Sequence, residues 1–194
     1  MFNTKLVATK KLSDNIKKIK LEKPKGFEFK PGNFVFMKYK GSQNPYSIAS
    51  SPKDPQLTFL IKKVNKYGFS KTIHELTEGE KLKISENKGK YFYEKEKSFN
   101  LVHTGLGIAP NLSIYKYAKQ TKRKPDINVV SINQNEFFWQ KLENETRIKM
   151  GNNSYIDQIT GNIIDSKIYY CGQEQTFEKI NQKISGLEIT KKLF

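Results

Sequence analysis

Two glycine-containing segments have the residue types that bind anions. The first, TGLGIAP from Thr104 to Pro110, lies where an apolar run ends and an amphipathic run begins. Gly105 and Gly107 carry no side chains, so their backbone can approach a phosphate, and the helix dipole there favours negative charge. Pro110 suits a first helical turn, where its missing N–H costs nothing. Without the third glycine of a dinucleotide fingerprint, the segment alone is also compatible with a purely steric turn.

The second segment, YGFSKTIHEL, offers the same chemistry nearer the N-terminus. Gly68 permits a tight turn, and Ser70 is placed to cap a helix whose free amides can hold a phosphate. Most capped helices hold no ligand, so an ordinary helix start is the alternative.

The chain has one cysteine and two histidines. Cys171 is the single cysteine, which excludes internal disulfides and any metal site built on several thiolates. It ends the apolar run KIYYCG, at the strand edge where α/β sheets bind ligands, although a buried apolar cysteine is the common alternative. His74 and His103 have no second ligand at metal-binding spacing, so we expect packing or surface roles and no metal.

Short alternating runs bounded by Gly, Pro, Asn or Asp organise the first half of the chain. They predict six strands and hence a small antiparallel barrel: KLVATKK, NIKKIKLEK, PGNFVFMKYK, YSIAS, LTFLIKKV and KLKISE. One helix, SKTIHELTE, interrupts them, with Ile73 and Leu76 on one face.

Strands and helices alternate in the second half. The strands LVHTG, INVVSI and KIYYCG and the helices APNLSIYKYAKQT, EFFWQKLEN and EQTFEKINQKIS predict a parallel sheet with covering helices. The charged stretch from Glu94 to Ser98 separates the halves, so we expect domains at 1–97 and 98–194.

The net charge of +16 lies mainly in the first half. Residues 1–97 carry 22 Lys and Arg against 10 Asp and Glu, a net charge of +12. A lysine-rich solvated surface or an acidic protein partner explains this better than nucleic acid, because the chain has only two arginines and no recognition motif. No apolar run approaches the roughly 18 residues of a membrane span, and the N-terminus lacks a signal peptide, so we expect a cytoplasmic protein.

The order of four motifs resembles the ferredoxin–NADP⁺ reductase superfamily over essentially the whole chain. Asn44 to Ser47 matches Arg-x-Tyr-Ser, Gly68 to Lys71 matches Gly-x-x-Ser, Gly105 to Pro110 matches Gly-Thr-Gly-Ile-Ala-Pro, and Cys171-Gly172 matches Cys-Gly. The resemblance implies a Greek-key FAD-binding barrel followed by a Rossmann-like NAD(P)-binding domain. The latter looks trimmed here, because Tyr155 to Ile168 is too short for a full extra strand–helix unit.

The resemblance also implies roles for individual residues. Ser47 would lie near flavin N5, where hydride arrives, and Cys171 near the nicotinamide, as the two catalytic positions. The small residues after Ser47 would let the flavin ring lie flat. The other expected cofactor-binding residues are Asn44, Tyr46, Ile48 and Phe194 for the flavin, Gly68, Phe69 and Ser70 for its pyrophosphate, and Thr104, Gly105, Gly107, Ile108, Pro110 and Gly172 for the nicotinamide nucleotide.

The chain departs from the family pattern at four places. Asn44 replaces the arginine that pairs with the FAD pyrophosphate, Gln173 replaces a proline, and KKLF lacks an acidic residue before the terminal aromatic. NADPH-preferring relatives usually keep Ser-x-Arg after the second strand, where this chain has Ser131-Ile132-Asn133 followed by Gln134 and Asn135. We therefore expect NADH to be preferred over NADPH, unless Arg147 or Lys149 supplies the missing cation.

The function implied is an FAD-dependent NAD(P)H oxidoreductase that passes electrons to ferredoxin or flavodoxin. Such acceptors are small acidic proteins, which agrees with the basic first half. Three alternatives remain open: a flavin reductase that releases flavin as a substrate, an electron-transfer subunit of a larger complex, and a basic nucleic-acid-binding barrel. The sequence does not indicate an oligomeric state.

Overall fold

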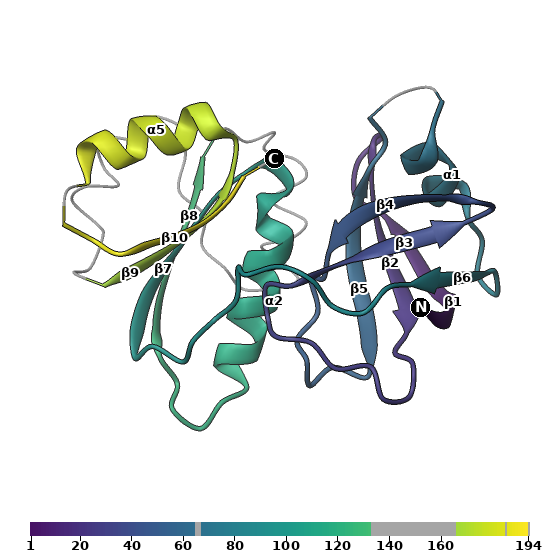
Figure 1. Ribbon diagram of the computed structural model, residues 1–194, viewed down its shortest axis with the longest axis horizontal. Helices are drawn as coiled ribbons and strands as arrows, with labels where there is room; N and C mark the ends of the chain where they lie inside the picture. Colours follow the sequence, from purple (N-terminus) through teal and green to yellow (C-terminus); the bar gives the residue numbers. More distant parts are fainter. Residues whose placement is uncertain (65–66, 133–165, 185, 194) are drawn as a thin grey trace.

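Two sheets organise the chain in the computed structural model, which describes residues 1–64, 67–132, 166–184 and 186–193. Figure 1 shows a six-stranded sheet in one lobe and a four-stranded sheet in the other, with helix α2 between them.

The six-stranded sheet contains all the strands expected in the first half. They are β1 (Phe2–Lys11), β2 (Ile16–Glu22), β3 (Phe34–Tyr39), β4 (Ser42–Ser47), β5 (Gln56–Lys62) and β6 (Lys81–Ile84). The order is β4-β3-β6-β1-β2-β5, and every pairing is antiparallel. The chain after β4 nearly closes the sheet, because Ala49 N–H donates to Thr58 O at 2.8 Å and Thr58 N–H donates to Ser50 Oγ at 3.1 Å. The predicted antiparallel barrel is confirmed.

Strand β4 begins and ends earlier than the predicted strand YSIAS. It starts at Ser42 and stops at Ser47, which pairs with Phe34 on β3. Because β4 bonds to a neighbouring strand on one side only, Pro45 needs no backbone donor on the other side and is accommodated inside it. Residues 48–50 leave the strand and are fully buried.

Burial explains the two residue patterns in these strands. On β3, Val35 and Met37 point into the barrel core while their neighbours are half-exposed or exposed, the alternation of a strand with one buried face. On β5, residues 57–61 are all buried, because Phe59 faces the barrel core whereas Leu60 packs against α2. A strand covered on both faces has an uninterrupted apolar run.

Helix α1 (Phe69–Glu75) confirms the helix expected in the first half, but Ser70 does not cap it. The N-cap position is Gly68, whose φ of 106° is one that a serine rarely adopts. Ser70 is the second helical residue, and its hydroxyl accepts a hydrogen bond from Val64 N–H at 3.4 Å. Ile73 and Leu76 are buried in the barrel core as expected.

The four-stranded sheet has the order β10-β9-β7-β8, with every pairing parallel. Its elements are β7 (Ser98–Thr104), the short helix η1 (Gly105–Gly107), α2 (Ile108–Lys119), β8 (Asp126–Ile132), β9 (Lys167–Gly172), α5 (Glu174–Lys183) and β10 (Ile189–Leu193). The expected parallel sheet is confirmed, and β10 is a strand that the sequence patterns did not predict. The expected helix EFFWQKLEN lies outside the described residues.

The helices cover opposite faces of this sheet. Leu101 and Tyr169 pack on the α2 face, whereas Val102 and Tyr170 pack on the α5 face. In Figure 1, α2 lies between the sheet and the barrel, and α5 lies on the outer side.

The small residues after Ser47 join the barrel to α2. Ile48 is fully buried in the barrel core. Ser113 on α2 donates to Ser50 O at 2.6 Å, and Ser51 donates to the Gln120 side chain. A larger side chain would separate the surfaces that these hydrogen bonds hold together.

Candidate functional site

The carboxyl ends of β7 and β9 form the position in the second sheet where a ligand is most readily bound. The chain runs from β7 to β8 on one side and returns to β9 on the other. Neighbouring crossovers therefore diverge between β7 and β9, the arrangement that leaves a crevice at the strand ends of an open α/β sheet. Thr104 and Gly172 are the last residues of the two strands.

The two glycines of the turn after β7 have different roles, although the sequence suggested one role for both. A Cβ on Gly107 would lie 2.0 Å from the carbonyl oxygen of Cys171, so Gly107 is required for the turn to pack against β9. Gly105 has a φ of 48° and open space around the position of a Cβ. Of the two glycines, Gly105 is therefore the one whose backbone a ligand could approach.

The turns after β7 and β9 are tied together. A Cβ on Gly172 would lie 2.2 Å from Thr104 Oγ1, and the N–H of Gln173 donates to that same oxygen at 3.1 Å. A proline at position 173 has no N–H to donate, so the departure from the family pattern at Gln173 supplies this link. Ile108 and Pro110 are buried in the first turn of α2, where they hold the turn in position.

Four polar side chains form a row across the second sheet, one from each strand. His103 pairs in register with Ser131 on β8 and with Cys171 on β9, and Cys171 pairs with Lys192 on β10. Each is the last residue but one of its strand. Paired residues of parallel strands share a face, and the Cys171 side chain packs on the α2 face, toward the barrel.

Lys192 is the member of this row suited to carry a charge at neutral pH. Burial raises the pKa of the Cys171 thiol to about 12, so the thiol stays protonated. Burial lowers the pKa of His103 to about 3, so the imidazole stays neutral. Burial also lowers the pKa of Lys192, but from a much higher starting value.

Lys192 brings the two expected catalytic positions together. Its Nζ donates a hydrogen bond of 2.8 Å to Ser47 Oγ on β4 and lies 4.9 Å from the centroid of the Phe34 ring. The same residue pairs in register with Cys171 on β9. Ser47 and Cys171 come from different sheets, and Lys192, which the motifs did not identify, spans the space between them.

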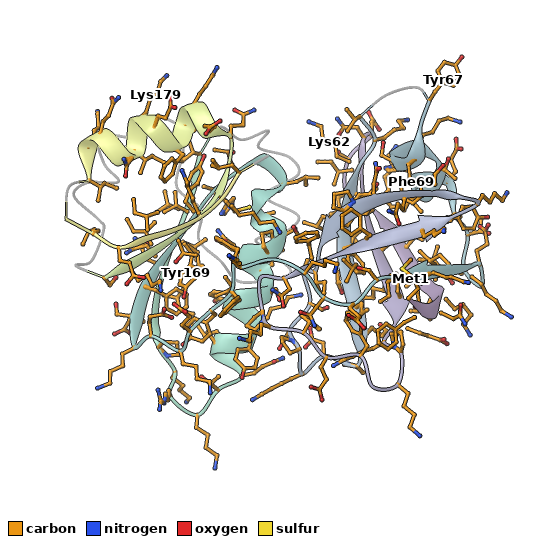
Figure 2. All side chains as sticks on the ribbon, in the orientation of Figure 1. Met1, Lys62, Tyr67, Phe69, Tyr169 and Lys179 are labelled. Carbon is orange, nitrogen blue, oxygen red and sulfur yellow. The ribbon has the colours of Figure 1, made fainter. Side chains whose placement is uncertain are left out.

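Tyr46 and Phe69 also come together from separate motifs. Their rings stack with centroids 6.3 Å apart and an interplanar angle of 27°, both half-buried. Figure 2 shows Phe69 on the barrel lobe, beside β4. Burial raises the pKa of Tyr46 to about 12, and its hydroxyl has no hydrogen-bond partner among the described residues; the exposed Asn44 is near but not at hydrogen-bonding geometry.

The remaining expected site residues lie outside the described part of the chain. These are Phe194, expected over the flavin, and Asn133, Gln134, Asn135, Arg147 and Lys149, expected to affect the choice of nucleotide.

A family model described as an FAD-binding domain matches residues 1–104. The chain belongs to this family. Two curated relatives are each 29% identical: the ferredoxin–NAD(P)⁺ reductase component of the naphthalene 1,2-dioxygenase system of Pseudomonas putida over 58% of this chain, and the gamma subunit of sulfhydrogenase 2 of Pyrococcus furiosus over 60%. The chain spans 36% and 43% of the lengths of these two relatives.

Solved structures show the same fold. A ferredoxin–NADP⁺ reductase from Neisseria gonorrhoeae with bound FAD and NADP has a TM-score of 0.80 at 15% identity, covering 98% of this chain and 97% of its own. Phthalate dioxygenase reductase has a TM-score of 0.80 at 19% identity, covering 97% of this chain and 67% of its own. Together with the family match, these findings give the chain an FAD-binding domain and the fold of the ferredoxin–NADP⁺ reductases. No helix among the described residues is long and apolar enough to cross a bilayer.

Proposed function

We propose that this protein is an FAD-dependent NAD(P)H oxidoreductase that passes electrons from the flavin to a one-electron acceptor. The observation that supports this most directly is the convergence of Ser47 from the barrel and Cys171 from the parallel sheet on one lysine, Lys192. Hydride transfer between two bound ring systems needs such a junction, since one ring must be held by each half of the protein.

The barrel side suits a flavin. The half-buried Tyr46–Phe69 pair offers aromatic surface. Because Ser47 Oγ accepts its hydrogen bond from Lys192, its own O–H remains able to donate to flavin N5. Bound FAD would supply the hydride-accepting chemistry, while Gly68, Phe69 and Ser70 would contribute the start of α1 to holding its pyrophosphate.

The parallel sheet suits the nicotinamide nucleotide. Gly105 offers open backbone before helix α2, where a pyrophosphate would meet the favourable end of the helix dipole. Cys171 would pack beside the nicotinamide as a neutral thiol, since its pKa lies far above neutral pH. In this assignment the protein contributes stacking, orientation and exclusion of water, and residues 1–97 and 98–194 act as the flavin and nicotinamide domains. NADH is the expected donor.

The acceptor we propose is a small acidic redox protein such as a ferredoxin or a flavodoxin. The first half carries a net charge of +12, and four lysines, Lys38, Lys40, Lys81 and Lys83, line a hollow of about 450 Å³ on the outside of the barrel. Opposite charge would raise the encounter rate by about 10- to 10³-fold at low salt, and counter-ions would remove most of that gain.

Anaerobic reconstitution with FAD followed by stopped-flow mixing with NADH or NADPH tests the proposal. We expect the flavin absorbance to bleach under first-order kinetics, with a higher kcat/KM for NADH. A protein that retains no FAD, or whose FAD is not reduced by either nucleotide, would contradict the function. A clear preference for NADPH would contradict the choice of donor alone.

The ionic-strength dependence of acceptor reduction tests the partner. Reduction of an acidic ferredoxin should slow steeply with added salt, while reduction by NADH changes little. Lys81→Glu with Lys83→Glu should reproduce the effect of salt. Lys179→Glu is the matched control, because Lys179 lies on α5 in the other lobe (Figure 2). Equal rates for acidic ferredoxins and neutral dyes at low salt would refute an acidic partner.

A further inference from the structure

We propose that Lys192 is the cation that balances the negative charge which the flavin acquires when it accepts a hydride, and thereby sets the reduction potential of the site. The inference rests on the proposed function, and it assigns to Lys192 a role that none of the four family motifs contains. It is drawn from the position of one side chain that reaches from the second sheet to the first.

The ammonium group of Lys192 lies among neutral groups at the junction of the two sheets. It is only partly exposed, its Nζ donates to the neutral hydroxyl of Ser47, and its other near neighbours are the Phe34 ring and the Cys171 thiol. Among the described residues, no carboxylate forms an ion pair with Lys192. A partly buried ammonium group paired only with neutral groups is costly unless an anion shares its environment.

The reaction supplies such an anion. A hydride carries two electrons and one proton, so a neutral flavin that accepts it gains one unit of negative charge unless a second proton follows from solvent. A cation fixed beside the flavin before the hydride arrives needs no reorganisation at that moment, and it stabilises the product more than the reactant. Lys192 therefore favours reduction with uptake of a single proton.

The distances give the size of the effect. Flavin N5, if hydrogen-bonded to Ser47 Oγ, would lie within about 6 Å of Lys192 Nζ, since each of the two hydrogen bonds spans roughly 3 Å. The added charge would reside mainly on the pyrimidine part of the ring, so about 6 Å is the shortest separation and sets the upper limit of the effect. At that separation and an effective dielectric constant near 20, one unit charge changes an equilibrium constant by up to about 100-fold. Removing the charge should lower the equilibrium constant for flavin reduction by about 10- to 100-fold. For a two-electron couple, this corresponds to a fall in the midpoint potential of about 30 to 60 mV.

The decisive measurement is the midpoint potential of bound FAD, determined by equilibration with redox dyes between pH 6 and pH 9. Lys192→Met should lower the potential by the amount given above, and Lys192→Arg should restore most of it. The slope with pH should steepen in Lys192→Met from about 30 mV toward about 59 mV per pH unit, as a second proton replaces the lost positive charge.

Lys191→Met is the matched control. Lys191 is the neighbouring residue on β10 and carries the same charge, but its Nζ lies 4.4 Å from the centroid of the Phe177 ring of α5, on the opposite face of the sheet. This variant should leave both the potential and its pH slope unchanged.

The outcomes separate the inference from the function on which it rests. If the wild-type protein retains no FAD, both fail. If it binds FAD and is reduced by NAD(P)H, but Lys192→Met has the potential of the wild type or shifts no further than Lys191→Met, the function stands and the role of Lys192 is refuted. A shift confined to Lys192→Met and reversed in Lys192→Arg supports the inference.

Discussion

Replacing Gly107 with alanine should destabilise the protein far more than the same change at Gly105, two residues away in the same turn. The added Cβ at position 107 would lie 2.0 Å from the oxygen and 2.7 Å from the carbon of the Cys171 carbonyl. Both are backbone atoms of a central strand, so they cannot rotate away. The turn or the strand must instead move by about 1 Å or more to restore an ordinary contact.

The cost follows from this geometry. Overpacking of a rigid interior site costs about 1 to 3 kcal/mol, and a clash with backbone belongs at the upper end of that range. For a protein of this size, 3 kcal/mol corresponds to a fall in Tm of about 6 to 12 °C. Gly105→Ala meets no neighbouring atom, and its left-handed φ of 48° costs about 1 kcal/mol, or about 2 to 4 °C.

Thermal unfolding followed by circular dichroism, with NADH titrations on the same samples, separates the two roles. Gly107→Ala should show the large fall in Tm. Gly105→Ala should stay close to the wild type in Tm but bind NADH more weakly, because its methyl group projects into the space where a phosphate would approach the backbone. Equal falls in Tm for the two variants would show that Gly107 does not mediate the contact between the turn and β9.

Four further results are expected. Ser47→Ala should retain FAD but slow hydride transfer by about 10²-fold, and an unchanged stopped-flow rate would exclude the hydrogen bond to the flavin. Asn44→Arg should tighten FAD binding measured by calorimetry, since arginine can make the charge-assisted contact that asparagine cannot. The free energy of unfolding should fall as the pH drops from 6.5 toward 3, because the unfolded chain protonates His103 while burial holds its folded pKa at about 3; His103→Asn should flatten this dependence in urea titrations. Cys171 should react with a disulfide reagent at pH 8 only after unfolding, because burial raises its pKa to about 12, and rapid reaction of the native protein would contradict that environment.

The fold was largely predictable because its determinants are local. Alternation along the strands and the turn residues between them predicted all six strands of the barrel, and the change to buried strands and amphipathic helices predicted the parallel sheet. The errors occurred where tertiary context decides the outcome. Strand β4 includes Pro45 only because it is an edge strand, and Gly68 rather than Ser70 occupies the N-cap because of the backbone angle required there.

The candidate site was predictable only within each motif. The short sequence motifs identify Tyr46, Ser47, Phe69, Gly105 and Cys171. The pairing of Cys171 with Lys192 depends instead on the register of two strands, which no motif contains. The segment ITKKL is short and lysine-rich, so its alternation was too weak to predict β10. One signal was available: each member of the row is the last residue but one of its strand, which would place Lys192 beside Cys171 once β10 is recognised.

Two departures from the family pattern change the charge near the expected cofactor, and we expect them to have different effects on the binding of oxidised and reduced FAD. Asn44 lacks a cation at the position expected beside the FAD pyrophosphate, a group whose charge is the same in oxidised and reduced FAD. Asn44→Arg should therefore tighten both forms equally and leave the midpoint potential unchanged. Lys192 belongs to KKLF, the segment that lacks the acidic residue of the family pattern, and it adds a cation beside Ser47, whose expected place is near flavin N5. Because the potential is linked to the ratio of the affinities for the two forms, Lys192→Met should weaken reduced FAD about 10- to 100-fold more than oxidised FAD. Equal weakening of both forms would mean that Lys192 acts only as a general anchor for the cofactor.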